Sequence, residues 1–152
     1  MALPLEPPNV RRTAPVAFGQ LSPEAAKRVA CSSRPGVLPQ LLEQAIIAGR
    51  LDLVELLLRD LGMSPDPPLA GGNSALHLAV EYYQPEIIEL LCACGTDPNT
   101  KKPGGWTPLH LAVDIEADSA HQEGRPPSTR LIRLLLEAGA DDSIEDERGV
   151  TP

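Results

Sequence analysis

The chain is poor in aromatic residues, and it has no long apolar run. Of its 152 residues only one is Trp, two are Tyr and one is Phe. A core must therefore be built from Leu, Ile, Val and Ala, which suits packed helices. No apolar stretch approaches the roughly 20 residues that a membrane-spanning helix requires, and Pro and Glu interrupt the start where a secretory signal would be apolar. We expect an intracellular, cytoplasmic protein with no membrane partner.

Cysteine and positive charge are also scarce. Three cysteines, an odd number, do not indicate the disulfide framework of a secreted domain. The formal net charge of −8 argues against a nucleic-acid partner, because such a partner normally requires a basic face. The acidic balance favours a protein partner with a basic or amphipathic segment. Nothing in the composition indicates an oligomeric state.

Proline is abundant, and its distribution divides the chain. Residues 1–36 contain six prolines, which remove backbone donors and fix φ, so we expect a largely disordered arm there. Within this arm, Ser22–Ala30 begins with an N-cap serine, followed by proline and glutamate, the pattern of a short helix. That helix is either transient or a docking motif. Residues 37–152 are predicted to form the folded domain.

From residue 38 onward, helical periodicity alternates with short loops rich in Gly and Pro. GGNSALHLAV at 71–80 recurs as GGWTPLHLAV at 104–113, which is 33 residues later. Apolar spacing and glycine stops predict paired helices at 38–48 and 50–61, at 74–83 and 85–94, and at 107–115 and 129–138. Units that repeat with this period bury their apolar faces by stacking on one another.

The phrases TPLHLAV, PEIIELL…CGTDPN and LIRLLLEAGAD resemble those of the ankyrin-repeat family. The resemblance covers roughly residues 38–152 and implies an all-α solenoid of stacked helix–turn–helix units with hairpin-like loops. It also implies a non-enzymatic module that binds another protein through the concave face of the stack. The units span about 37–69 (repeat 1), 70–102 (repeat 2) and 103–145 (repeat 3, with an insert near 116–128), and a fourth begins at 146–152.

Three departures from the family pattern bear on the structure. Repeat 1 has QLLEQA at 40–45 instead of TPLHLA and one extra residue before Asp66, as expected of an N-terminal capping unit. Tyr83 replaces a helix-ending glycine, so we expect that turn to take another conformation. The chain ends as its fourth unit opens, which favours a fragment or truncated product over a stack whose last unit is left uncapped. The alternative function is therefore a targeting or regulatory segment of a longer enzyme or multidomain protein truncated at residue 152.

Side chains that could support catalysis or metal binding have structural explanations. The resemblance implies that His77 and His110 hold the first helix of a repeat and the adjoining turn by hydrogen bonds. Cys92 and Cys94 are one residue apart, closer than zinc ligands usually are. The acidic segment 114–124 lacks the glycine and the bidentate glutamate of a calcium loop. A solvated loop is favoured there over a partner-contacting finger or the metal site of a hydrolase. We predict no catalytic residue, metal or cofactor.

Partner-binding residues follow from the resemblance by position, because the family uses the turn tips and the exposed side of the first helices. The corresponding residues here are Asn73, Glu81, Tyr82, Pro103, Trp106, Asp114, Ile115 and Arg148. Trp106 is the preferred anchor, since the fold does not demand an aromatic residue at a variable tip position and Trp is common in interface hot spots. The alternative is that Trp106 only covers the adjacent tip.

Overall fold

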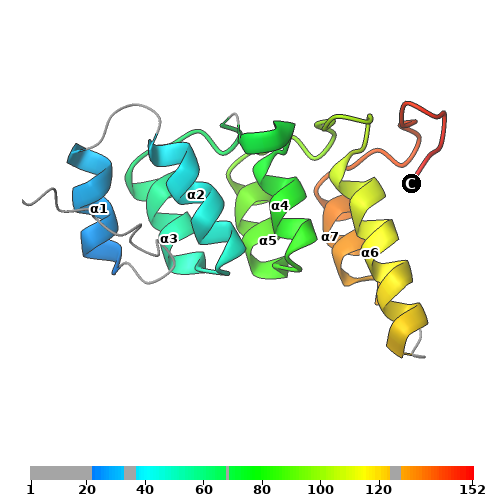
Figure 1. Cartoon of the computed structure of the whole chain (residues 1–152), viewed down its shortest axis with the longest axis horizontal. Helices are drawn as coiled ribbons and strands as arrows, with labels where there is room; N and C mark the ends of the chain where they lie inside the picture. Colours follow the sequence, from blue (N-terminus) through cyan, green and yellow to red (C-terminus); the bar gives the residue numbers. More distant parts are fainter. Residues whose placement is uncertain (1–21, 33–36, 68, 124–127) are drawn as a thin grey trace, which may run out of the picture.

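The computed structural model describes residues 22–32, 37–67, 69–123 and 128–152, and every regular element in these ranges is helical. Figure 1 shows a row of helix pairs, with the loops that join successive pairs gathered along one edge. The predicted all-α repeat architecture is confirmed. In chain order the elements are α1 (Pro23–Ser32), α2 (Val37–Ile47), α3 (Leu51–Glu55), η2 (Leu56–Asp60), η3 (Ala70–Gly72), α4 (Ala75–Glu81), α5 (Pro85–Ala93), α6 (Pro108–Glu123) and α7 (Arg130–Glu137).

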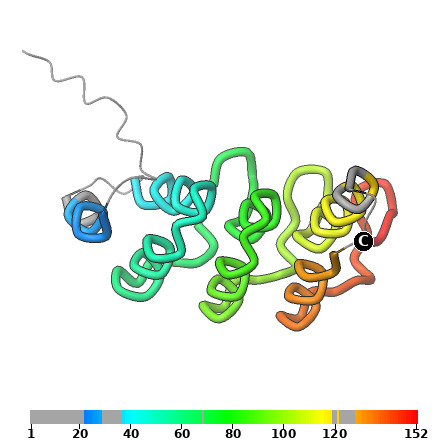
Figure 2. The backbone as a smooth tube through the Cα atoms, turned by 90° about the horizontal axis from the view of Figure 1, so that it is seen from below, coloured from blue at the N-terminus to red at the C-terminus, as the bar shows by residue number. Residues whose placement is uncertain are grey.

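The helix pairs form two layers (Figure 2). The first helices of the repeats, α2, α4 and α6, pack side by side in one layer, and α3, α5 and α7 form the other. The core between them is aliphatic and continuous from repeat to repeat. Small residues such as Ala79 and Ala112, both completely buried, let neighbouring helices approach closely. Since each pair alone would expose one apolar face, stacking supplies the core.

Helix α1 confirms the short helix predicted within the arm. Ser22 caps it, with its Oγ accepting a hydrogen bond from the Ala25 backbone at 3.3 Å. The helix packs against α3 and buries Ala26 completely, so it is docked on the first repeat. Residues 1–21 of the predicted arm lie outside the described residues.

The extra residue of repeat 1 is absorbed inside its second helix. The segment from Gly49 to Gly62 is one residue longer than the equivalent Tyr83–Gly95 segment of repeat 2. The α3 helix continues as a π-helical turn, η2, in which the Leu61 amide donates to the Leu56 carbonyl at 3.0 Å. A π turn accommodates one added residue without ending the helix, so the loop after it keeps its register with the next repeat.

The turn between α4 and α5 differs from our expectation. Tyr83 does not adopt another conformation; it takes the left-handed backbone of the missing glycine, with φ of 50°, close to the 66° of Gly49 in repeat 1. Among the described residues it is the one non-glycine with positive φ. The expectation was wrong because packing of α4 against α5 fixes the turn, and the tyrosine must accept its strain.

Replacing Tyr83 with glycine is expected to raise the free energy of unfolding by about 0.5–1 kcal/mol, because left-handed backbone costs a side-chain-bearing residue about 1–2 kcal/mol. The lost contact is small, since Tyr83 is 42% exposed and its hydroxyl lies 3.2 Å from the exposed Ser128 Oγ. Tyr82→Gly is the matched control, because Tyr82 is 44% exposed with an ordinary φ of −93°. Urea unfolding should show that the control is destabilised. A loss of stability in both variants would contradict the assignment of backbone strain to Tyr83.

The insert of repeat 3 is also different from its prediction. Instead of ending near Ile115 and giving way to an acidic loop, α6 continues to Glu123 and extends past the ends of the neighbouring helices (Figure 1). The position equivalent to Gly49 and Tyr83 is Glu116, and no Gly or Pro follows before residue 124, so nothing stops the helix. Residues 124–127 lie outside the described part of the insert.

Glu116 is buried rather than solvated. The residue is 1% exposed, and its Oε1 accepts a hydrogen bond from the Leu131 amide at 2.9 Å, near the start of α7. Thr129, the residue before α7, provides no side-chain cap. Glu116 therefore caps α7 across the insert and holds the two helices of repeat 3 together.

Candidate protein-binding site

Two equivalent turns form the tips of the last repeats. In the first, the Lys102 amide donates to the Trp106 carbonyl at 2.9 Å. In the second, the Asp146 amide donates to the Val150 carbonyl at 2.8 Å. Neighbouring tips are joined by a bond of 3.2 Å from the Glu147 amide to the Gly104 carbonyl. These three bonds hold the backbone of both tips, including that of Trp106, in a defined conformation.

His77 connects one repeat to the tip of the next. Its Nε2 lies 2.9 Å from the Trp106 carbonyl, which can only accept, so Nε2 carries the proton. Its Nδ1 is then free to accept from the Ser74 amide at 3.3 Å and lies 2.8 Å from Ser74 Oγ. Ser74 Oγ in turn caps α4 by accepting from the His77 amide. This reciprocal cap orients the ring toward the next tip.

His110 repeats this arrangement one unit later. Its Nδ1 lies 2.8 Å from Thr107 Oγ1, and its Nε2 lies 2.9 Å from the Val150 carbonyl. The predicted structural role of His77 and His110 is confirmed, and the turn that each histidine holds belongs to the following repeat.

Stability should depend on pH through His77. Burial lowers the pKa of His77 from 6.5, and this outweighs the bond to the Trp106 carbonyl, which raises it. The unfolded chain therefore binds a proton more readily than the folded one below pH 6.5. We expect the free energy of unfolding to be highest above that pH and to fall as the pH drops toward the lowered pKa. Urea unfolding of His77→Gln between about pH 5 and 8 should show a smaller slope; an unchanged slope would contradict this assignment.

Trp106 is half-buried at its tip. One side of the ring stacks on His110, with centroids 6.2 Å apart and planes inclined by 30°. Two cations flank the ring, with Lys102 Nζ at 5.9 Å and Arg148 Cζ at 6.0 Å from its centroid. Both distances are within the range of cation–π attraction. The indole also packs partly against the hydrophobic core, and the half-buried ring still reaches the surface.

Asp146 fixes the position of Arg148, and the sequence reasoning missed it. Its side chain is 1% exposed and accepts from the amides of Arg148 at 2.8 Å and Val150 at 2.9 Å. The guanidinium of Arg148 completes the set at 3.0 Å. The Val150 bond contributes most to lowering the pKa of Asp146, followed by the bonds to Arg148. The sequence signal that could have identified Asp146 is its position three residues before Gly149, because aspartate and glycine at this spacing are typical of turns.

Trp106 and Arg148 border a groove of about 240 Å³ between α6 and the last tip. On the α6 side it is lined by Val113, Asp114 and Ala117. Apolar, acidic and cationic groups therefore meet in one hollow. Of the predicted partner-binding residues, the structure brings Trp106, Asp114 and Arg148 together here.

A model of the family described as ankyrin repeats, in three copies, matches residues 42–146. The chain belongs to the ankyrin-repeat family. Ankyrin repeats are generally protein-interaction modules, and the groove lies where the tips of this ankyrin-repeat chain meet its first helices.

Curated relatives share this region to different extents. Glycerophosphocholine phosphodiesterase gde1 of Schizosaccharomyces pombe is 36% identical over 123 residues, 79% of this chain and 10% of the relative. Protein PhlB of Serratia liquefaciens is 38% identical over 113 residues, 74% of this chain and 44% of PhlB. Protein phosphatase 1 regulatory subunit 27 of Mus musculus is 30% identical over 139 residues, 90% of this chain and 83% of that protein. The ankyrin-repeat chain thus spans less than half the length of the first two relatives.

The other predicted partner-binding residues lie apart from the groove. Asn73 lines a separate hollow of about 330 Å³, together with Gly72 and Thr100. Pro103 covers the neighbouring tip, since a Cβ on Gly72 would lie 2.9 Å from its Cδ. Ile115 is half-buried and packs against the core. The remaining two, Glu81 and Tyr82, are exposed at the far end of α4.

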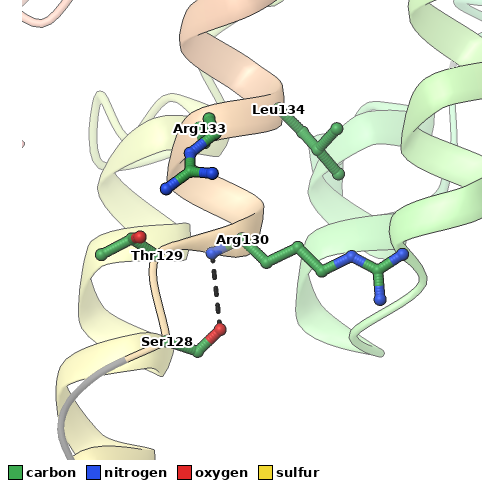
Figure 3. Close-up of a pocket in the computed structure, with 5 residues that line it drawn as sticks. All are labelled: Ser128, Thr129, Arg130, Arg133 and Leu134. Carbon is green, nitrogen blue, oxygen red and sulfur yellow. Dashed lines mark hydrogen bonds between the residues drawn. The ribbon is translucent and has the colours of Figure 1, made fainter.

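A further hollow of about 290 Å³ lies at the start of α7, in the outer layer of helices. Figure 3 shows Arg130 and Arg133 pointing in different directions from the helix, with the Arg130 amide donating to Ser128 Oγ at 3.4 Å. Arg130 is already paired with Glu86 at 3.2 Å. None of the side chains that line this hollow is buried, so it has no preformed ligand site.

The described residues contain no cluster of side chains suited to metal binding, and the thiol of Cys92 is not activated. No group of three or more His, Cys, Asp or Glu side chains in these ranges is placed to hold a metal ion. Cys92 and Cys94 are free, and burial raises the pKa of the Cys92 thiol, which disfavours the reactive thiolate. None of the described helices combines the length and apolar character needed to cross a membrane.

Proposed function

We propose that the chain is a non-enzymatic protein-binding module whose partner docks on the concave face, at the groove beside Trp106. The observation that carries this proposal is the half-exposed indole on a hydrogen-bonded tip, where His77 holds the Trp106 carbonyl and Lys102 and Arg148 flank the ring. A preorganised aromatic side chain loses little conformational entropy when a partner covers it. The free cysteines Cys92 and Cys94 are compatible with a cytoplasmic location.

The charge beside the groove supports a basic or amphipathic partner segment. Asp114 lines the groove, and Asp118 is exposed one helical turn further along α6. Glu81 adds an exposed acidic side chain on α4. Like-charged partners would be repelled by this surface, whereas Lys or Arg residues would be attracted to it.

Trp106→Ala is expected to weaken partner binding by about tenfold or more, while circular dichroism and the melting temperature stay nearly normal. Quantitative affinity capture should compare the wild-type chain, Trp106→Ala and Leu136→Ala. Leu136 is the matched control, because it is apolar and 44% exposed on α7 in the outer layer. Proteins retained by the control and lost from Trp106→Ala are the expected partners. An unfolded Trp106→Ala variant would instead make Trp106 structural and remove the site.

A second candidate function is a targeting or regulatory segment of a longer enzyme or multidomain protein. The relative gde1 favours it, since this chain corresponds to 10% of a protein named as a phosphodiesterase. Protein phosphatase 1 regulatory subunit 27 favours the first candidate function, a separate protein-binding module, because this chain covers 83% of that relative. The reading frame of the transcript after residue 152 separates the two.

A further inference from the structure

The insert gives α6 a longer exposed surface than its equivalent in repeat 2. Helix α6 has 16 residues and α4 has 7. At about 1.5 Å per residue the two helices are about 24 Å and 10 Å long. Figure 1 shows the added turns projecting beyond the rest of the stack. The binding face of repeat 3 is therefore extended on the side away from the tips.

Residues at helical spacing continue the groove along this extension. Val113, Asp114 and Ala117 line the groove next to Trp106. Asp118 follows Asp114 by one turn and is exposed. Side chains three and four apart share one face of a helix, so the apolar end at the tip and the acidic end at the extension belong to one stripe.

The acidic charge of this stripe on α6 is not neutralised by any described Lys or Arg side chain. Helix α6 contains four acidic residues and no Lys or Arg. The side chains of Asp114 and Asp118 form no hydrogen bond or ion pair with any residue that the structure describes. By contrast, Arg148 at the tip end is already neutralised by Asp146 at 3.0 Å. A partner therefore meets net negative charge on α6, and at the tip it meets the Trp106 ring with Lys102 and Arg148 beside it.

We propose that the partner segment is a cationic amphipathic helix that lies along α6 and uses the extension of this helix, at Asp118, as part of its binding site. Its apolar side chains contact Trp106, Val113 and Ala117. Its Lys or Arg residues meet Asp114 and Asp118. The inference rests on the proposed function, and it adds the chemistry and length of the partner. A helix suits the site because a straight stripe with i, i+3, i+4 spacing is matched by the ridges of a second helix.

A synthetic helix tests this directly. The probe is a peptide of about five helical turns, long enough to follow α6, with Leu on one face, Lys on its flanks and no aromatic residue. Its counterpart carries Glu instead of Lys. Trp106 is the single Trp of the chain, so its fluorescence reports occupation of the groove. The Lys peptide is expected to bind at least about tenfold more tightly than the Glu peptide and to lose this advantage at high salt.

Variants of the chain complete the test. Asp114→Lys with Asp118→Lys should raise the Kd of the Lys peptide by about tenfold or more. The control, Glu89→Lys with Glu137→Lys, makes the same change in net charge on exposed residues of α5 and α7 and should leave the Kd nearly unchanged. Equal weakening by both pairs, equal binding of both peptides, or binding without a change in Trp106 fluorescence would overturn the inference.

Two further outcomes separate this inference from the proposed function. A natural partner lost from Trp106→Ala and retained by the Asp114→Lys, Asp118→Lys variant would overturn the role of α6 and leave the proposed function standing. Sedimentation of the chain alone should show a monomer. A dimer broken by the same double variant would assign the groove to a second copy and overturn the inference.

Discussion

Replacing Gly105 with alanine is expected to lower the free energy of unfolding by about 3 kcal/mol or more. Gly105 has φ of 77°, which is strained for alanine. A Cβ there would lie 2.7 Å from the backbone nitrogen of Glu147 and 3.1 Å from the carbonyl carbon of Asp146. Both are backbone atoms of the next tip and cannot rotate away. Relief would require the two tips to separate and the bond from Glu147 to Gly104 to break.

Gly104→Ala is the matched control, because Gly104 precedes Gly105 and also has a positive φ, of 93°. Its added Cβ would lie 3.8 Å from Trp106 Cδ1, which is ordinary contact. This variant should therefore lose only the conformational cost of about 1–2 kcal/mol. Urea unfolding with a common m-value measures the difference. Equal losses in the two variants would show that close packing of the tips contributes nothing.

The repeat architecture could be predicted because its signals are local and occur twice. The phrases beginning at Gly71 and Gly104 carry the turn, the N-cap and the apolar face of a first helix within ten residues each. The structure uses them in that way: Ser74 and Thr107 are caps, and His77 and His110 each form a hydrogen bond with the tip of the next repeat. The helix ends marked by glycine could be predicted for the same reason, because each stop signal is local.

What could not be predicted depends on contacts between distant residues. Tyr83 was expected to avoid a glycine conformation, because strain at one turn is judged locally while the packing that enforces it is not. The buried cap by Glu116 joins residues 15 apart across the insert, so composition alone assigned that acid to solvent. The sequence has no Gly or Pro between Ile115 and Gly124, and this local signal predicts a continued helix more strongly than the acidic composition predicts a loop.

The candidate site was predicted only at its centre. Family position identified Trp106, Asp114 and Arg148, which meet in one groove. Family position also predicted Ile115, which packs partly against the core. The reason is that position in a repeat does not specify which side chains of a lengthened helix are exposed. Asp146 was missed since its role is to hold the tip backbone and Arg148, a role that depends on burial rather than residue type.

Glu116→Ala is expected to lower the free energy of unfolding by about 1.5–3 kcal/mol, because a charge-assisted bond to the Leu131 amide is lost in a buried place. Asp118→Ala, on the same helix and exposed, should change it by less than about 0.5 kcal/mol. Thermal and urea unfolding of the two variants measure the contrast. Comparable stabilities would mean that α7 is held by its apolar packing alone.

Glu116→Gln separates the hydrogen bond from the charge. The amide oxygen can still accept from Leu131, while Oε2 of the native side chain is buried with no hydrogen-bond partner among the described residues. Since a buried charge with an unsatisfied oxygen is costly, glutamine should be at least as stable as glutamate and clearly more stable than alanine. If glutamine is as damaging as alanine, the negative charge itself anchors α7. If the expected order holds, a neutral side chain at position 116 caps α7 as well as glutamate does, and the cap keeps α7 in register with α5 although α6 is about two turns longer. The acidic character of the groove then depends on exposed residues such as Asp114 and Asp118.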